Sequence, residues 1–182
     1  MSSSSKSTLW IQNLLKDFKV ENISKNEYFL KAGDRPNLIG YIQKGIFKIV
    51  DETEPRKKIK DFCVENDFLG SYGSILTGDP IHYNITAMED SQVLVGNINK
   101  VLESHQDTME YLKFSKYFLE YVYNQKEEKE NDFMLMNIEE KVIRFREIYK
   151  NHLHRISKIE VATYFGITLS SLGRIERRLN IK

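Results

Sequence analysis

Residues 157–179 read SKIEVATYFGITLSSLGRIERRL and are the most informative stretch of the chain. Ser157 and Glu160 have the spacing of a capping box, in which each side chain hydrogen-bonds a backbone amide at the start of a helix. Gly166 is the residue type that ends helices in the left-handed region, and Thr168 then stands at the N-cap position of a second helix. Two short helices joined by so tight a turn predict a helix-turn-helix.

The second helix, predicted over Leu169–Leu179, is the one that such a motif places in the major groove of DNA. We expect Arg174 to read a base, because a guanidinium can donate to O6 and N7 of guanine together. The other predicted contacts with bases or phosphates come from Lys158, Thr168, Leu169, Ser170, Ser171, Arg177 and Arg178. The predicted core of this small domain consists of Ile159, Val161, Phe165, Ile167, Leu172 and Ile175, with Ala162 at the helix crossing. An ordinary helical hairpin with a charged face is the alternative.

The charge of the chain divides in the same way. The 182 residues include 27 Lys or Arg and 26 Asp or Glu, a net charge of +1. Residues 133–182, however, hold ten basic against five acidic residues, whereas residues 1–132 hold seventeen against twenty-one. A basic C-terminal segment of this kind indicates a nucleic-acid partner, here double-stranded DNA. Uneven sampling of solvated helix faces is the alternative explanation.

The N-terminal half alternates short apolar or β-branched segments with turn residues, which is typical of an all-β roll or barrel. The predicted strands are Glu27–Lys31, Leu38–Lys44, Ile46–Val50, Lys57–Val64, Ile81–Ala87 and Ser91–Asn97. Residues 51–56 are expected to form a polar hairpin loop, because their proline cannot donate to a β-ladder. Before the roll, the apolar residues of Leu9–Lys19 have helical spacing and predict a short N-terminal helix.

From Asp107 onward the apolar period changes to that of a helix. Residues 107–110 match a capping box, and we expect a helix of about 23 residues that ends near residues 126–130. Its apolar residues occupy more than one stripe, so we expect it to pack on the roll and on the same helix of a second subunit. Packing within its own chain is the alternative. Residues 137–140 predict a further helix start, followed on one face by Val142, Phe145, Ile148 and Tyr149.

With its roll, long helix and helix-turn-helix in this order, the chain resembles the Crp/Fnr transcription regulators. The motifs that carry the resemblance are Lys31-Ala-Gly-Asp34, Leu38-Ile-Gly-Tyr-Ile-Gln-Lys-Gly45, Asn66-Asp-Phe-Leu-Gly70, Ile85-Thr-Ala-Met-Glu-Asp-Ser-Gln-Val93 and Leu172-Gly-Arg174. The resemblance implies an α+β chain with three parts. These are a cyclic-nucleotide-binding-like β-roll (a double-stranded β-helix or jelly roll) over residues 1–106, a dimerisation helix over residues 107–132 and an all-α helix-turn-helix domain over residues 133–182.

The resemblance also implies partners. It predicts a homodimer, joined through the helix at residues 107–130, that reads a pseudo-palindromic DNA site and has RNA polymerase as a candidate second partner. Many family members continue into a C-terminal β-hairpin wing, whereas only residues 180–182 follow the recognition helix here. We therefore expect fewer phosphate contacts. Leu169 stands where polar base readers are frequent, which makes it a candidate for contact with a thymine methyl group.

The resemblance fails at the ligand pocket. Family members that bind cyclic AMP carry a helix beginning Gly-Glu-Leu and, about ten residues later, an Arg-Ser or Arg-Thr pair whose guanidinium neutralises the phosphate. Here Ser71 replaces the Glu, and Ile81-His82 falls where the pair is expected. A buried cyclic phosphate would lack its charge partner, so we expect no physiological binding of cyclic AMP. The candidate pocket residues are Gly70, Ser71, Tyr72, His82 and Tyr83. Two alternatives stay open for the roll. It binds an apolar or aromatic ligand, or its interior is filled by side chains and it serves only as a dimerisation scaffold.

Other classes of function lack support in the sequence. The single cysteine, Cys63, cannot form an internal disulfide or a cysteine-ligated metal site, and its alternation with apolar neighbours predicts a packed side chain. No catalytic motif or metal-ligand spacing occurs, so we expect neither an enzyme nor a cofactor. No apolar run approaches the roughly 18 residues of a membrane span, and residues 1–8 lack the apolar core of a signal peptide. We therefore expect a cytoplasmic protein without a membrane partner.

The alternative to a specific transcription regulator is a ligand-sensing or protein-interaction module. In that case the roll would carry the function, and a degenerate helix-turn-helix would bind DNA only non-specifically.

Overall fold

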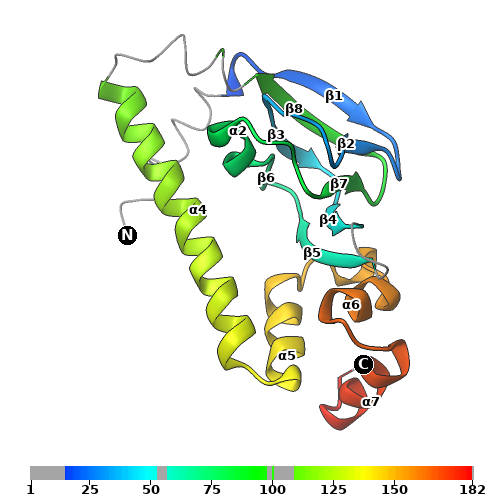
Figure 1. Ribbon diagram of the computed structural model, residues 1–182. Helices are drawn as coiled ribbons and strands as arrows, with labels where there is room; N and C mark the ends of the chain where they lie inside the picture. Colours follow the sequence, from blue (N-terminus) through cyan, green and yellow to red (C-terminus); the bar gives the residue numbers. More distant parts are fainter. Residues whose placement is uncertain (1–14, 53–56, 98–99, 101–108, 182) are drawn as a thin grey trace. The chain divides into compact units, whose positions relative to one another are not determined.

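The computed structural model describes residues 15–52, 57–97, 100 and 109–181. The chain divides into two compact units, Met1–Gln106 and Asp107–Lys182, each of which is described by itself (Figure 1). The division into three domains that the sequence suggested stays a prediction.

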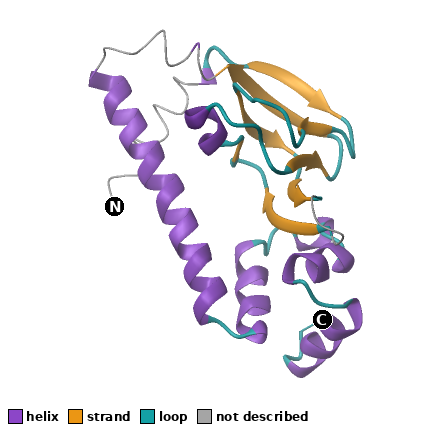
Figure 2. Ribbon diagram, in the orientation of Figure 1, coloured by secondary structure: helices purple, strands orange, loops and turns teal. Residues whose placement is uncertain are grey.

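The described part of the first unit contains two four-stranded antiparallel sheets (Figure 2). One sheet has the order β1 (Lys19–Ile23), β8 (Ser91–Asn97), β3 (Leu38–Lys44) and β6 (Phe68–Leu69). The other has the order β2 (Tyr28–Leu30), β7 (Asn84–Ala87), β4 (Phe47–Asp51) and β5 (Lys58–Cys63). Ile42 and Val93 from the first sheet share one core with Phe47 and Ile85 from the second. Because both sheets contribute to this core, the unit is a jelly-roll-like sandwich.

The turn from β3 to β4 depends on Gly45. Its φ is +121°, and a Cβ at this position would lie 2.1 Å from Oγ of Ser91. Its amide donates to Oε1 of Glu65 at 2.9 Å. Only glycine provides both the backbone conformation and the space, so this residue fixes the connection between the two sheets.

All six predicted strands are present in the roll. Leu38–Lys44 and Ser91–Asn97 match to the residue, and three others differ by one residue at each end. The predicted strand Ile81–Ala87 is wrong at its start, because β7 begins at Asn84. Ile81 instead exchanges backbone hydrogen bonds with the loop before β3: Gly33 donates to its carbonyl at 2.8 Å, and its amide donates to the carbonyl of Asp34 at 2.9 Å.

The sequence missed two strands and one short helix, namely β1, β6 and α2 (Tyr72–Thr77). β1 is an edge strand in which only Ile23 is buried, so no apolar alternation marks it. The predicted helix Leu9–Lys19 falls largely outside the described residues, but Lys19 already belongs to β1, so the helix cannot reach it. Phe18 is buried against Gly96, where a Cβ would lie 2.3 Å from its ring.

The second unit is helical. Its elements are α4 (Met109–Leu135), α5 (Ile138–Ile148), the 3₁₀ turn η1 (Leu153–Arg155), α6 (Lys158–Phe165) and α7 (Leu169–Arg178). The predicted end of α4 near residues 126–130 is wrong, because the helix continues through this charged run to Leu135. Lys, Glu and Gln are good helix formers, and charge alone does not end a helix. The predicted capping residue Asp107 lies outside the described residues. Of the helices in the described ranges, none combines the length and apolar character that a bilayer crossing requires.

The core of the second unit joins α5, α6 and α7. Val142, Ala162, Leu172 and Ile175 are buried together, and the half-buried Ile138, Val161, Phe165, Ile167 and Leu179 pack against them. The predicted core position Ile159 is wrong, because this residue is 66% exposed, and Ile148, predicted on the apolar face of its helix, is 47% exposed. The 3.6-residue period places each of them to the side of the buried face of its helix.

Candidate nucleic-acid interface and ligand pocket

α6 begins and ends at the residues that the sequence predicted. The Glu160 amide donates to Oγ of Ser157 at 3.3 Å, and the Ser157 amide donates to Oε2 of Glu160 at 3.2 Å, which completes the capping box. At the other end, Gly166 has φ +66° and its amide donates to the carbonyls of Ala162 and Thr163. A left-handed glycine satisfies the last carbonyls of the helix and turns the chain sharply.

α7 follows after the three residues 166–168. The hydroxyl of Thr168 accepts from the Ser171 amide at 3.1 Å and caps the helix, as predicted. Because Leu172 and Ile175 are buried with Ala162 of α6, the two helices form one packed pair.

The outward face of α7 carries residues that the sequence predicted to contact bases or phosphates. Leu169, Ser170, Arg174, Arg177 and Arg178 are exposed, and Ser171 is half-buried. Nη2 of Arg174 donates to Oγ of Ser171 at 3.2 Å, and Nε of Arg177 donates to the carbonyl of Gly173 at 3.2 Å. Within the part of the chain that the structure describes, neither guanidinium forms an ion pair with a carboxylate. Both charges are therefore available to an anionic partner.

Two other predicted phosphate contacts have carboxylate partners in their own chain. Nζ of Lys158 lies 2.5 Å from Oε2 of Glu176. Nη1 of Arg178 is paired with Oε1 of Glu139 on α5. The structure thus brings Thr168, Ser171 and Arg174 together at one end of α7, whereas Lys158 and Arg178 join α7 to the other helices.

Glu176 is a residue that the sequence reasoning missed. It is buried on α7, with its side chain 10% exposed. A signal was present, since Glu176 follows the core residue Leu172 by four positions and therefore lies on the same side of the helix.

The candidate ligand pocket in the roll is built around α2. Ser71 precedes this helix and is buried, and its hydroxyl donates to Oγ of Ser74 at 2.9 Å. Tyr72 is half-buried, whereas His82 is exposed. Tyr83 packs against the core of the roll, and Nζ of Lys60 lies 4.7 Å from the centre of its ring. The predicted pocket residues therefore differ in burial and do not form a single polar cluster.

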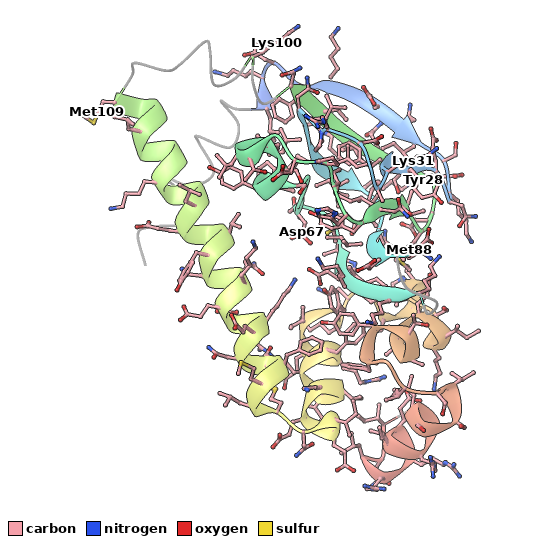
Figure 3. All side chains as sticks on the ribbon, viewed as in Figure 1. Tyr28, Lys31, Asp67, Met88, Lys100 and Met109 are labelled. Atoms are coloured by element: carbon pink, nitrogen blue, oxygen red, sulfur yellow. The ribbon has the colours of Figure 1, made fainter. Side chains whose placement is uncertain are left out.

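Other polar groups of the roll stabilise its surface turns. Nζ of Lys31 lies 5.0 Å from the centre of the Tyr28 ring (Figure 3). The hydroxyl of Tyr41 donates to Oδ1 of Asn66 at 2.9 Å. Burial, and secondarily the negative charge of Asp67, raise the pKa of Tyr41. No group of three or more His, Cys, Asp or Glu side chains among the described residues is arranged to hold a metal ion.

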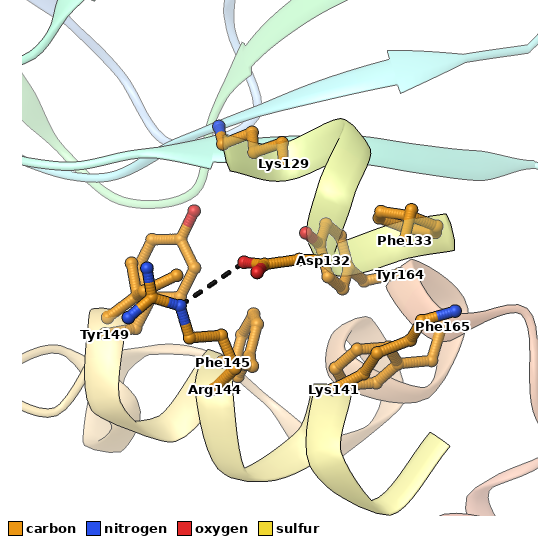
Figure 4. A pocket seen from close by; sticks show the side chains of 10 residues that line it. Lys129, Asp132, Phe133, Lys141, Arg144, Phe145, Tyr149, Tyr164 and Phe165 are labelled. Atoms are coloured by element: carbon orange, nitrogen blue, oxygen red, sulfur yellow. Dashed lines mark hydrogen bonds and ion pairs between the residues drawn. The ribbon is translucent and has the colours of Figure 1, made fainter. Parts of the chain in front are cut away.

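Aromatic rings connect the end of α4 to α5 and α6. Phe133 lies 6.2 Å from Tyr164, whose ring is 5.4 Å from that of Phe145. Beside them, Nε of Arg144 lies 3.3 Å from Oδ2 of Asp132 (Figure 4). The hollow between these side chains measures about 30 Å³. This volume admits one or two water molecules but not a small-molecule ligand. The cluster therefore packs the end of α4 against α5 and α6 and is not a ligand site.

Comparison with known proteins identifies the fold. Residues 20–106 match the family model described as the cyclic nucleotide-binding domain. CLP, the c-di-GMP responsive global regulator of Xanthomonas campestris, is 14% identical; the match covers 95% of this chain and 91% of that chain, with a TM-score of 0.70. FixK2 of Bradyrhizobium japonicum is 13% identical over 90% of this chain and 84% of its own, with a TM-score of 0.73.

The catabolite activator protein of Thermus thermophilus is 14% identical; the match covers 93% of this chain and 82% of that one, with a TM-score of 0.57. No curated protein sequence matches the chain. Of these three solved neighbours, CLP is described as a global regulator and the Thermus protein as a catabolite activator. The first unit therefore matches the cyclic nucleotide-binding domain model, helices follow it, and the chain shares its fold with CLP and FixK2.

Proposed function

We propose that this chain is a DNA-binding transcription regulator of the Crp/Fnr type. In this proposal α6 and α7 form a helix-turn-helix, and α7 is the recognition helix. The observation that carries the proposal is the exposed face of α7, where Arg174 and Arg177 have no carboxylate partner among the described residues while the opposite face is packed in a core. A cationic helix face, held rigidly and offered to solvent, is what major-groove recognition needs.

The geometry at the start of α7 supports specific reading of bases. The hydrogen bond from Arg174 to Ser171 holds the guanidinium along the exposed face, so less side-chain entropy is lost when it binds. Arg174 would donate to O6 and N7 of a guanine, and the exposed side chain of Leu169 would contact a thymine methyl group. Arg177 would bind a phosphate, which fixes register without reading sequence.

We propose that α4 joins two copies of the chain. Met109, Leu112, Leu119 and Tyr123 are between 44% and 65% exposed. They follow one another at spacings of three, seven and four residues, which places them on one heptad face. A second α4 would cover this face. The dimer would present two α7 helices to a pseudo-palindromic site with half-sites about one helical turn apart.

We propose that the roll does not respond to cyclic AMP. The predicted pocket residues include no arginine or lysine, the hydroxyl of Ser71 is bonded to Ser74, and His82 is exposed. A buried cyclic phosphate would therefore meet no fixed positive charge from these residues. CLP, described as responsive to c-di-GMP, is a precedent for a different effector on this fold. Calorimetry with cyclic AMP at neutral pH should give no heat of binding in the micromolar range, and measurable binding there would contradict this part.

Selection from random duplex DNA at about 150 mM salt tests the main proposal, because non-specific binding is weak at this ionic strength. A specific dimer should enrich an inverted repeat. The variant Lys150→Ala removes an exposed positive charge outside α6 and α7, so it should enrich the same repeat and serve as the control. Recovery of DNA without a shared motif would favour the alternative, an interaction module with a non-specific DNA-binding domain.

A further inference from the structure

Glu176 is the single acidic residue of α7, and it lies on the buried side of the helix. Removing a carboxylate from water is costly unless cations and hydrogen-bond donors replace the solvent. Arg177 and Arg178, which follow it directly, are both exposed and have other partners, the Gly173 carbonyl and Glu139. The carboxylate therefore depends on partners from other helices.

Two cations from two different helices supply that compensation. Oε2 of Glu176 lies 2.5 Å from Nζ of Lys158, the first residue of α6. Oε1 lies 3.8 Å from Nη1 of Arg146 on α5. Each carboxylate oxygen thus has its own cation, and α5, α6 and α7 meet at this one side chain. We refer to Glu176, Lys158 and Arg146 as the carboxylate clamp.

The clamp fixes the direction in which the proposed base reader points. Arg174 precedes Glu176 by two residues, and two residues in an α-helix span roughly 200° around the axis. With Glu176 held inward, Arg174 must face outward. Leu172 and Ile175 also face the core, but apolar contacts are non-directional and tolerate small rotations better than a charge-assisted hydrogen bond does.

We propose that Glu176 is a positioning residue for α7 and that Lys158 stays paired with it when DNA is bound. This inference rests on the proposed DNA-binding function, and it removes Lys158 from the phosphate contacts that the sequence predicted. Its ammonium neutralises Glu176, so it adds nothing to the counterions that DNA releases on binding.

The first experiment measures DNA affinity against salt concentration for the full-length chain and its selected duplex. Lys158→Met should weaken binding by misplacing α7 while the slope of log K against log salt stays at the wild-type value. Arg177→Met is the matched control, and it should lower the slope by about one per subunit, as the loss of a phosphate contact does. A slope that falls equally for Lys158→Met would overturn the proposal.

The second experiment needs no DNA. Thermal unfolding is compared for Glu176→Gln, Lys158→Met and the double variant. If Glu176 and Lys158 interact directly, the effects of the two single substitutions on the unfolding equilibrium constant should not be additive in the double variant. If the residues are independent, the double variant should match the combined single effects within about twofold. Additive effects would overturn the clamp. If the Glu176 variant does not fold, Lys158→Arg provides the test, because it keeps a cation at this position. It should retain the stability that Lys158→Met loses. An equal loss of stability in both variants would also overturn the clamp.

The two experiments separate the clamp from the proposed function. A wild-type chain that selects no DNA motif would refute the specific regulator, yet the unfolding cycle would still report whether Glu176 and Lys158 are coupled. In a chain that does select a motif, Glu176→Gln should lower the preference for the base read by Arg174 by about tenfold. An unchanged preference would contradict the positioning role.

Discussion

Replacing Arg174 by alanine should abolish sequence preference at one base pair of each half-site and leave preference at the others in place. The guanidinium is exposed and hydrogen-bonded to Ser171 at 3.2 Å, so it can reach a base edge without breaking an ion pair. A bidentate contact with guanine is worth about 1–3 kcal/mol. This energy corresponds to roughly 5- to 150-fold in affinity per subunit, and to the square of that factor in a symmetric dimer.

The assay is a titration of labelled duplexes, followed by fluorescence anisotropy, with the selected sequence and with sequences changed at one base pair. Arg174→Lys is the informative control. It keeps the charge, so it should preserve the salt dependence but lose the base preference, because an ammonium cannot form the planar two-point contact. If Arg174→Ala instead weakens all duplexes by the same factor, Arg174 binds a phosphate and the assignment of the base reader is wrong.

Four further substitutions test other parts of the structure. Leu119→Glu puts a charge on the exposed heptad face of α4 and should shift the chain from dimer to monomer in analytical ultracentrifugation; an unchanged dimer would place the interface elsewhere. Gly166→Ala should lower the free energy of unfolding by about 1–2 kcal/mol, because its φ of +66° is left-handed. A Cβ here would meet nothing within 4 Å, so crowding adds nothing to this backbone cost. Gly173→Ala, inside α7 and equally uncrowded, should raise that free energy by up to about 1 kcal/mol. Because the folded pKa of Tyr41 is raised, its contribution to stability is complete below the unfolded pKa of about 10 and is lost as pH rises through the folded value. Tyr41→Phe should therefore reduce the loss of stability seen in denaturant titrations above pH 10, and an unchanged pH profile would contradict the shift.

The elements that the sequence predicted well are those whose signals are local. The capping box at Ser157 and the left-handed Gly166 each lie within a few residues of the backbone groups that they satisfy, so their spacing is visible in the chain itself. Strands that alternate strongly, such as β8, were equally visible. β1 was not, because an edge strand with one buried residue carries no alternation, and its pairing with β8 is formed by residues about seventy positions away.

In the candidate DNA-binding site too, the sequence predicted local features but not contacts between distant residues. Basic character predicted that Lys158 and Arg178 would contact phosphates, but a count of charges does not reveal which cations have carboxylate partners in the fold. Glu176 meets Lys158 across eighteen positions, and Glu139 meets Arg178 across thirty-nine. Tertiary contacts over such separations depend on how the helices pack, so they are absent from any local pattern.

These internal ion pairs change what the basic C-terminal segment implies for affinity. Its ten basic against five acidic residues predicted a nucleic-acid partner. In the described residues, however, several of these cations form ion pairs with carboxylates of the same chain. The pairs are Lys158 and Arg146 with Glu176, Arg178 with Glu139, and Arg144 with Asp132. On α7 this leaves Arg174 and Arg177 as charges without a carboxylate partner. Two phosphate or base contacts from α7 by themselves give modest affinity at physiological salt, since each released counterion contributes separately. Tight binding would then require both subunits to engage one site, where the second contact benefits from the high effective concentration created by the first.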